Sequence, residues 1–412
     1  MLFEWLLVPV GLALIVAVAR VGADVATRVG QPRIAGQLVG VVLVGPTVLG
    51  GQVEGVVRGA SGRGAVDAIF PAVSVGVLAV VGSLGLVLYM LLVGLTIDPR
   101  PMARRAGTIA LLVLAISAGT AVVALAAAAW LRHLGGWQGP SAGGVAFALA
   151  LAAALIANGV PVVARILEER GLLRTEVGAI TISSAGAITT LALVVSGVAI
   201  KGAGASAAER FVLVLAAAAV LVAAVTVLAR AHGSRLAPGA AIAALLGLSI
   251  AAGVAGRSLL GTALVGPLVV GIAASGTSAS AAFVEERLGT VVREVLLPVF
   301  LGFAALHANL RELGPGVLGP VVAIIAAVTV VKLAAGYGVA RVTGFSRPDA
   351  GAIAAMLQCG GVMTIAISLA ILDAGLITTR LHAALTLAGL ATTVLAGPLL
   401  KRSGVAPASA VV

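Results

Sequence analysis

A single lysine lies inside a long apolar segment of this sequence. Lys332 stands in the stretch VTVVKLAAG, within an apolar run from Val317 to Ala340, and no acidic residue lies between Glu312 and Asp349. Burying an isolated ammonium group costs on the order of several kcal/mol. We therefore expect Lys332 to have lost its proton, to be solvated in a cavity, or to bind a partner that the sequence does not reveal.

Two glycine-containing pairs interrupt other apolar segments near their middle. Asn158–Gly159 lies in the run 143–167, and Gly360–Gly361 lies in the run 349–372. A helix that breaks at membrane depth frees backbone N–H and C=O groups, which is tolerated only where they line a site or a cavity. For one glycine alone, close helix packing is the simpler explanation. Two such breaks in corresponding places favour a binding site.

The composition indicates that these residues lie in a membrane protein. Hydrophobic residues make up 61% of the 412 residues and charged residues 10%, with a mean hydropathy of +1.20. A soluble domain of this size could not cover its surface with so few polar side chains. Apolar runs of bilayer-spanning length recur along the whole chain. We predict thirteen spans, at 6–22, 33–49, 72–97, 106–131, 143–167, 176–199, 210–230, 237–255, 261–274, 288–308, 316–342, 349–372 and 380–400.

The net charge of +11 is explained by membrane topology, so no nucleic-acid partner is expected. If the N-terminus is outside, the inside segments hold seventeen basic residues and the outside loops hold eight, and Lys332 completes the total of 26. Basic residues concentrate in cytoplasmic loops. We therefore predict a multi-pass protein with its N-terminus outside and its C-terminus cytoplasmic. The Ala-, Val- and Gly-rich usage with Arg over Lys is typical of a high-GC bacterium and indicates a bacterial inner (plasma) membrane.

Short sequences recur in the two halves of the chain. VGPTVLG (44–50) returns as VGPLVVG (265–271), and NGVPVVARILEERGLLRT (158–175) has a counterpart in GGVMTIAISLAILDAGLITT (360–379). Paired interruptions in corresponding places are typical of secondary transporters that are built from inverted repeats. We therefore predict an all-α polytopic fold with inverted repeats. Residues 1–412 are expected to form one transmembrane domain without a soluble regulatory domain.

Five segments of the chain are similar to the motifs of one transporter family. They are QPRIAGQLVGVVLVGPTVLG (31–50), LGLVLYMLLVGLTIDPR (84–100), VPVVARILEERGLLRTEVG (160–178), LLPVFLGFAALHANL (296–310) and the helix around Lys332. In these motifs the chain resembles the monovalent cation:proton antiporters of the Kef and plant cation/H+ exchanger type. The resemblance covers essentially the whole chain. It implies a homodimer in which each protomer has a scaffold and a six-helix core with two crossed, broken helices.

The resemblance also identifies charged residues that are missing. In the family, the helix after the first broken one carries one or two acids that bind the cation or protons and often pair with the lysine corresponding to Lys332. Those positions read as Ile188 and Thr189 here, and the helix from Val177 to Ile200 contains no carboxylate. Other polar or charged family positions read as Asn158, Cys359, Met363 and His307. The resemblance therefore implies an ion site in which neutral groups replace the charged ones.

The remaining polar residues form the predicted substrate- or ion-binding set. Besides the helix breaks at Gly159, Gly360 and Gly361, this set contains Asn158, Thr181, Ser183, Ser184, Thr189, Thr190, Lys332 and Gln358. We expect Lys332 to point between the two broken helices, within reach of Ser183, Ser184 or Thr189. The nearest acid by expected depth, Glu294, stands beside Arg293 near a helix start. We expect Glu294 to face the membrane interface.

Three functions remain open at this stage. The first is exchange of Na⁺ or K⁺ for protons by alternating access, which the resemblance favours and the missing acids oppose. The second is transport of an organic anion or a lipophilic carboxylate on the same scaffold, because an unpaired lysine suits such a substrate. The third is a non-transporting sensor or scaffold. None of these is an enzyme, no cofactor is expected, and the single cysteine, Cys359, excludes a multi-cysteine metal site.

Overall fold

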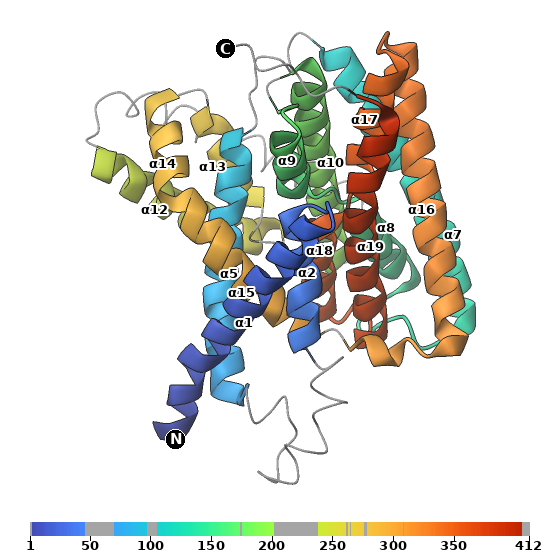
Figure 1. Ribbon diagram of the computed structural model, residues 1–412. Helices are drawn as coiled ribbons and strands as arrows, with labels where there is room; N and C mark the ends of the chain where they lie inside the picture. Colours follow the sequence, from blue (N-terminus) through green and yellow to red (C-terminus); the bar gives the residue numbers. More distant parts are fainter. Residues whose placement is uncertain are drawn as a thin grey trace.

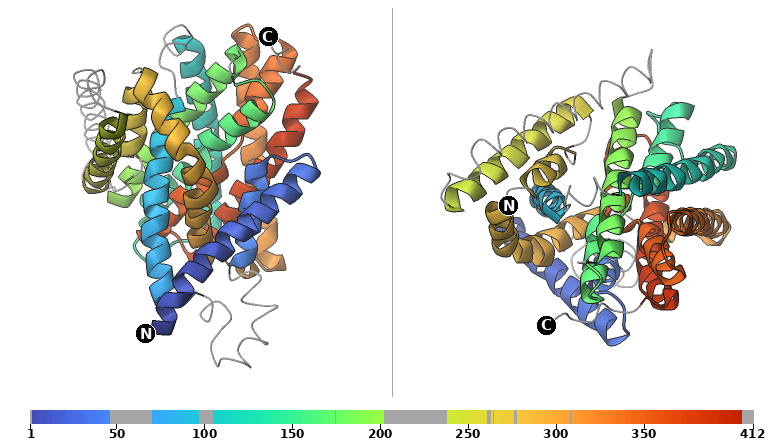
Figure 2. Two further views of the ribbon diagram at one scale, coloured as in Figure 1. Left: turned by 60° about the vertical axis from the view of Figure 1, so that its left-hand side comes forward. Right: turned by 90° about the horizontal axis from the view of Figure 1, so that it is seen from above.

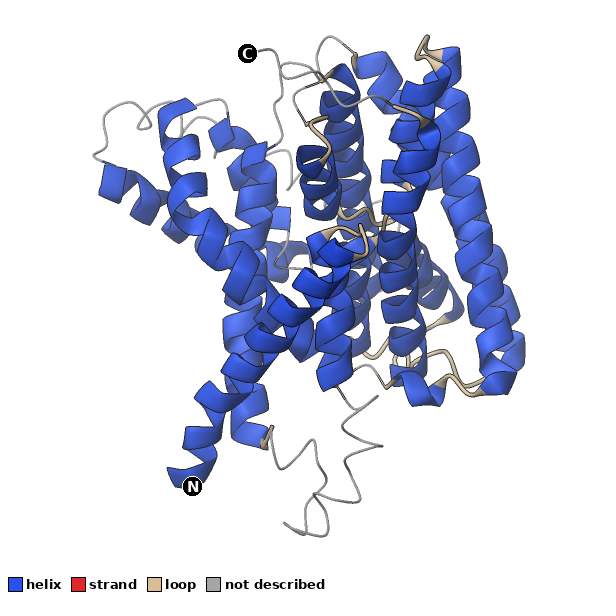
Figure 3. Cartoon of the chain, viewed as in Figure 1, coloured by secondary structure: helices blue, strands red, loops and turns tan. Residues whose placement is uncertain are grey.

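The fold of this protein is built from helices. The computed structural model describes residues 2–45, 70–96, 105–173, 175–201, 238–260, 263, 265–275, 278–307 and 309–405, and these are almost entirely helical (Figure 3). Within them the only β-type pairing is an isolated bridge between Gln138 and Ile377. Helices are the expected solution in a bilayer, because a helix satisfies its backbone hydrogen bonds internally.

The helices form two groups that lie side by side (Figures 1 and 2). The first group contains α1 (Leu2–Arg28), α2 (Arg33–Val44), α5 (Ala72–Thr96), α12 (Pro238–Leu260), α13 (Val265–Ser275), α14 (Ser278–Val291), a π-helical segment (Val292–Leu296) and α15 (Leu297–Leu306). The second contains α7 (Ala106–Leu134), α8 (Gly144–Ile156), α9 (Val160–Glu169), α10 (Glu176–Lys201), α16 (Pro315–Val342), α17 (Arg347–Leu357), α18 (Gly361–Asp373) and α19 (Thr379–Ser403). A short 3₁₀ turn (Leu310–Glu312) precedes α16.

The number of membrane crossings stays a prediction. In the described part of the chain, eight helical stretches are long and apolar enough to cross a bilayer, and four shorter apolar helices accompany them. The predicted span 210–230 lies outside the described residues, as do the ends of the spans 33–49 and 72–97. The all-helical, multi-pass character that the sequence predicts is confirmed.

The ends of the first and last described helices lie together. The Lys401 ammonium near the end of α19 lies next to Gly30, just after α1, and the side-chain oxygen of Gln31 lies next to Gly397. Because α1 is long enough to cross a bilayer, α1 begins on the face opposite to the one where α19 ends. This arrangement agrees with termini on opposite sides, while the assignment of one side to the cytoplasm stays a prediction.

Glycines allow helices of the first group to pack with their backbones in contact. A Cβ atom on Gly36 of α2 would overlap with the carbonyl of Gly22 on α1, and a Cβ atom on Gly94 of α5 would overlap with the carbonyl of Leu268 on α13. Inside a bilayer, helix association depends on van der Waals packing, so small residues at such contacts bring the helices close. Neither α1–α2 nor α5–α13 could keep this separation with a larger residue.

The substitution Gly36→Ala is expected to lower the stability of the protein, because the added methyl group forces α1 and α2 apart. Overpacking of this kind costs about 1–3 kcal/mol. Thermal unfolding can be followed through the thiol of Cys359, which is fully buried and becomes reactive to a fluorogenic maleimide on unfolding. Gly107→Ala is the matched control, because a Cβ atom there meets nothing within 4 Å. Equal unfolding temperatures for the two variants would contradict the packing argument.

Candidate functional site

Two helices are interrupted near the middle of the second group. α8 ends at Ile156 and α9 begins at Val160, while α17 ends at Leu357 and α18 begins at Gly361. These positions coincide with the interruptions that the sequence predicts. In both cases a glycine-containing pair breaks a segment that is apolar on either side, so a local loss of helical hydrogen bonds follows from the residue types.

The polar groups freed by one interruption bind those freed by the other. The backbone N–H of Gly159 donates to the carbonyl of Cys359 at 2.8 Å, and the side-chain Nδ2 of Asn158 donates to the carbonyl of Leu357 at 2.9 Å. All four residues are buried. Because backbone groups cannot be left unpaired at this depth, the two breaks stabilise each other.

The glycines at the breaks are required by the close approach of the two chains. A Cβ atom on Gly159 would lie 3.1 Å from the carbonyl oxygen of Gly360. Gly361 adopts φ +53°, a conformation that favours glycine, and a Cβ atom there would lie 2.9 Å from a methyl group of Val162. Larger residues at these positions would separate the interruptions.

Lys332 binds the end of the first half-helix. Its side chain is 1% exposed, and Nζ donates to the carbonyl oxygens of Ile156 and Ala157, each at 3.1 Å. These carbonyls end α8 and carry the partial negative charge of a helix C-terminus. No carboxylate of the described residues forms an ion pair with Lys332. The ammonium group is therefore stabilised by a helix end rather than by an acid.

The hydroxyl contacts predicted for Lys332 are replaced by these carbonyls. The structure gives Lys332 no hydrogen bond to Ser183, Ser184 or Thr189, because the α8 carbonyls take its place as acceptors. Thr189 instead donates to the backbone carbonyl of Asn158 at 2.7 Å, which ties α10 to the first interruption. Ser183 and Ser184 are buried on α10.

Among the other residues of the predicted ion-binding set, some lie at the interruptions and some form hydrogen bonds only within α10. Gln358 donates through Nε2 to the carbonyl of Thr392 at 2.9 Å, and it borders a small cavity of about 20 Å³ that also touches Lys332. Thr181 and Thr190 bond carbonyls of their own helix, at 2.6 and 2.9 Å. The interruptions therefore bring together Asn158, Thr189, Lys332 and Gln358 with the three glycines, whereas Thr181 and Thr190 serve α10 itself.

Three buried oxygen atoms, two at the interruptions and one on α10, have no hydrogen-bond partner among the described residues. They are Asn158 Oδ1, Gln358 Oε1 and Ser184 Oγ. Buried polar atoms are nearly always paired, so each unpaired one calls for an explanation. Neutral amide, hydroxyl and carbonyl oxygens are the ligands of monovalent cations in dry sites. The described interruptions thus offer oxygen atoms of the type that binds monovalent cations, without a negative charge beside them, and their role as an ion site stays a prediction.

Sequence reasoning missed the part that α19 plays at the second interruption. The hydroxyl of Thr392 accepts from the backbone N–H of Gly360 at 3.2 Å, and the hydroxyl of Thr393 lies 3.7 Å from the sulfur of Cys359. Nothing in the sequence distinguishes these threonines from others in apolar helices. Their role depends on α19 lying against the break, which is a tertiary contact.

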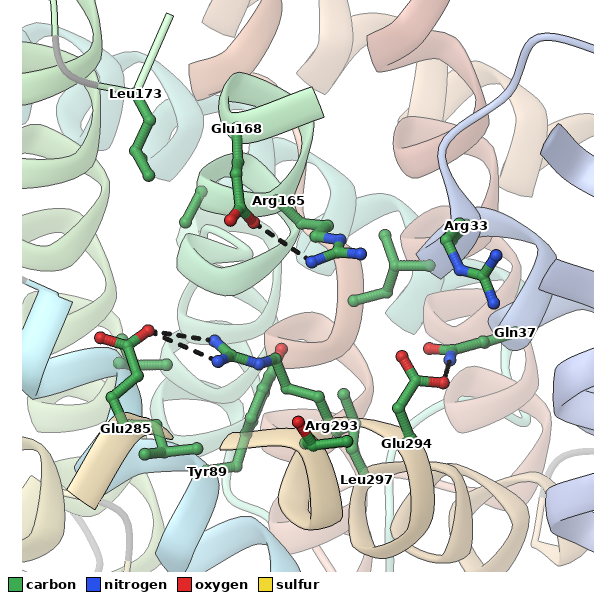
Figure 4. Close-up of a pocket in the computed structure, with 15 residues that line it drawn as sticks. Arg33, Gln37, Tyr89, Arg165, Glu168, Leu173, Glu285, Arg293, Glu294 and Leu297 are labelled. Carbon is green, nitrogen blue, oxygen red and sulfur yellow. Dashed lines mark hydrogen bonds and ion pairs between the residues drawn. The ribbon is translucent and has the colours of Figure 1, made fainter. Parts of the chain in front are cut away.

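A second feature that the sequence did not reveal is a charged cavity of about 280 Å³ between the two groups of helices (Figure 4). It is lined by the start of α2, the last third of α5, the surface of α9, the second half of α14 and the π-helical segment. Its charged residues are three arginines and three glutamates: Arg33, Arg165, Arg293, Glu168, Glu285 and Glu294. Glu294, which the sequence analysis expects to face the membrane interface, lies in the π-helical segment and lines this cavity, while its depth in the bilayer stays a prediction.

Comparison with known proteins decides the family. Residues 12–403 match the model of the transmembrane sodium/hydrogen exchanger family. The chain belongs to the sodium/hydrogen exchanger family. The resemblance that the sequence motifs indicated is therefore confirmed, and it extends over nearly the whole chain.

The chain is also similar to individual cation/proton antiporters, which is consistent with this family. Cation/H(+) antiporter 18 of Arabidopsis thaliana is 24% identical over 320 residues, which are 73% of this chain and 37% of the relative. Cation/H(+) antiporter 15 of the same plant is 34% identical over 179 residues, or 42% of this chain and 20% of the relative. The sodium proton antiporter MjNhaP1 from Methanocaldococcus jannaschii has a similar fold, with a TM-score of 0.67 and 14% identity over 98% of this chain and 100% of that structure. The match thus spans 37% of the length of the first of these plant relatives and 20% of the second.

The positions that the resemblance assigns to missing charges carry no acidic residue in this exchanger-family chain, and most of them are buried. Ile188 is fully buried on α10 beside Thr189, and Cys359 and Met363 are fully buried around the second interruption. His307 follows α15, where its Nδ1 lies 2.9 Å from the carbonyl oxygen of Phe303. No described residue at these positions could balance a bound cation with a negative charge. Whether they mark the family's ion site in this chain stays a prediction.

Proposed function

We propose that this chain is the membrane domain of a monovalent cation:proton antiporter that works by alternating access. The proposal rests on the position of the Lys332 ammonium group, which donates hydrogen bonds to the carbonyl oxygens at the end of α8. A protonated lysine at that place acts as a tethered cation. A free Na⁺ or K⁺ ion that binds the same oxygens must displace it.

Because a cation and the protonated lysine cannot bind the same carbonyl oxygens at the same time, cation flux would be coupled to proton flux. When Lys332 loses one proton to solvent, the carbonyls of Ile156 and Ala157 become free to accept one monovalent cation. When the cation leaves, the lysine takes up a proton and returns to the same oxygens. Charge balances at one cation for one proton. Because the ligands are neutral oxygens, we expect weak cation affinity.

The organic-anion alternative has less support from the geometry. The cavity beside Lys332 measures about 20 Å³, which is room for about one water molecule. The ammonium group of Lys332 also donates its hydrogen bonds to two backbone carbonyls, so these N–H groups do not point into an open cavity where an organic anion could bind. An organic carboxylate would require the two interruptions to separate widely.

Flux measurements in vesicles test the proposal. The purified protein is reconstituted into vesicles with an acidic interior and a trapped pH dye, and Na⁺, K⁺ or a short-chain carboxylate is added outside. We expect dissipation of the pH gradient by Na⁺ or K⁺ at high concentration, and no response to choline or in protein-free vesicles. A response to the carboxylate alone would replace the proposal by organic-anion transport, and a lack of any response would favour a non-transporting scaffold.

The proposal extends to the surroundings of the chain. We infer a homodimer in a bacterial plasma membrane, with the N-terminus outside and the C-terminus in the cytoplasm. The family resemblance supports the dimer, and the excess of basic residues in alternate loops supports the orientation. In this orientation the charged cavity opens towards the cytoplasmic side, since Arg33, Arg165 and Arg293 belong to segments assigned to that side.

A further inference from the structure

The charged cavity contains one carboxylate that no arginine neutralises. Arg33 pairs with Asp24 at 3.4 Å, and Arg165 pairs with Glu168 at 3.2 Å and with Glu169 at 3.4 Å. The third cavity arginine, Arg293, pairs with Glu285 at 3.4 Å. Each arginine of the cavity therefore has an acid within ion-pair distance, and these pairs use two of the three cavity glutamates.

The third glutamate has only a neutral partner. Glu294 Oε2 accepts from Nε2 of Gln37 at 3.5 Å, and no ion pair of Glu294 exists in the described part of the chain. Figure 4 shows that Arg293 and Glu294, although consecutive, point in opposite directions, Arg293 towards Glu285 and Glu294 towards Gln37. Both residues belong to the π-helical segment. Single-turn π-helical insertions occur frequently at functional sites.

A buried hydroxyl without a partner faces the same cavity. Tyr89 of α5 lines the cavity, is 1% exposed, and its hydroxyl has no hydrogen-bond partner among the described residues. Figure 4 shows the tyrosine ring among the cavity residues, with its hydroxyl at the end that faces the charged side chains. Leaving a buried hydroxyl without a hydrogen-bond partner costs free energy. A bound ion or its water would remove this cost.

We propose that Glu294, together with Gln37 and Tyr89, forms a monovalent-cation site in which the cation and a proton compete for the Glu294 carboxylate. One unpaired negative charge suits a monovalent cation, whereas divalent cations prefer several carboxylates. The neutral ligands would be the Tyr89 hydroxyl and the amide oxygen of Gln37, which requires the Gln37 amide to turn its oxygen, instead of Nε2, towards the cation. An anion is disfavoured because the arginines of the cavity are already paired. The site supplies the titrating carboxylate that α10 lacks.

The competition involves one proton and one cation. When a proton is bound to the carboxylate of Glu294, an arriving cation replaces that proton, which passes to solvent. The charged and titratable groups that face Glu294 are Arg33 of α2, Tyr89 of α5, Arg165 and Glu168 of α9, Glu285 of α14, and Arg293 of the π-helical segment. Because cations are excluded while Glu294 is protonated, the apparent affinity should rise with pH.

Direct binding tests this site without requiring transport. Radiolabelled Rb⁺ and Na⁺ are titrated against the purified protein in detergent, and proton release on cation addition is recorded in weakly buffered solution. We expect one proton released per cation bound by the unmodified protein. In Glu294→Gln we expect affinity to fall by about tenfold or more and the proton release that accompanies the tighter binding to disappear, because the variant has neither the charge nor the titrating group. Only the weak binding and proton release that the proposed function assigns to Lys332 should remain.

Glu168→Gln is the matched control, since it removes an acid of the same cavity that Arg165 already neutralises. We expect its cation affinity to stay within about threefold of the unmodified protein. Glu294→Asp keeps the charge and should restore proton release. Unchanged affinity in Glu294→Gln, equal losses in both glutamine variants, or no measurable binding by the unmodified protein would each overturn the site.

The role of this site in exchange rests on the proposed function, but its existence does not. Cation binding that depends on Glu294, without any flux in vesicles, would keep the site and reject antiport. Antiport that is unaffected by Glu294→Gln would keep the proposed function and reject a role of this site in exchange, while the binding measurements decide whether the site exists. The two hypotheses can therefore fail separately.

Discussion

Replacing Lys332 by arginine is expected to leave the protein folded and to abolish cation-driven proton flux. Arginine retains a positive charge and N–H donors for the carbonyls of Ile156 and Ala157. It cannot release its proton under any condition that a protein survives. In the proposed mechanism the oxygens at the end of α8 would then stay occupied, and flux should fall by about tenfold or more.

Replacing Lys332 by methionine separates the structural from the functional role of this residue. The methionine has no donor, so two buried carbonyls lose their partner at a cost of about 1–3 kcal/mol each. We expect a lower unfolding temperature, measured through the Cys359 thiol, in addition to lost flux. Lys401→Met, at the exposed end of α19, is the control and should match the unmodified protein in both measurements. Normal flux in the arginine variant would refute the displacement mechanism.

Introducing an acid at Thr189 is expected to strengthen cation binding at the interruptions. Thr189 is 1% exposed, and its hydroxyl lies 2.7 Å from the carbonyl oxygen of Asn158. A carboxylate there would stand among cation ligands that now lack a negative charge. We expect Thr189→Asp to lower the cation concentration that gives half-maximal flux by about tenfold or more, because a charge pair in a dry site is strong.

The matched control is Thr189→Asn, which has nearly the same shape as the aspartate variant without its charge. It should leave the half-maximal concentration close to that of the unmodified protein. The measurement is the same vesicle assay across a range of Na⁺ and K⁺ concentrations. If both variants behave alike, or if Thr189→Asp loses flux while its unfolding temperature is unchanged, position 189 does not belong to the cation path.

Sequence alone determined the class of the protein and the places where its helices break. The membrane environment follows from composition, because so few polar residues cannot cover a soluble domain. The breaks at Asn158–Gly159 and Gly360–Gly361 follow from local residue types, since glycine has little preference for the helix. The family follows from motifs that are continuous in sequence. All of these are properties of neighbouring residues.

Only the tertiary structure decided what those residues touch. Lys332 donates to the backbone carbonyl of Ile156, which lies 176 positions away in the sequence. Every residue has a backbone carbonyl, so the amino-acid sequence does not indicate which carbonyl accepts the hydrogen bond. The sequence shows Glu294 only as an acid beside Arg293 near a helix start, whereas the structure shows that it lines a cavity together with residues of α2, α5 and α9. The direction of a side chain depends on how helices from distant parts of the chain pack together. That packing decides which polar groups are left without a partner.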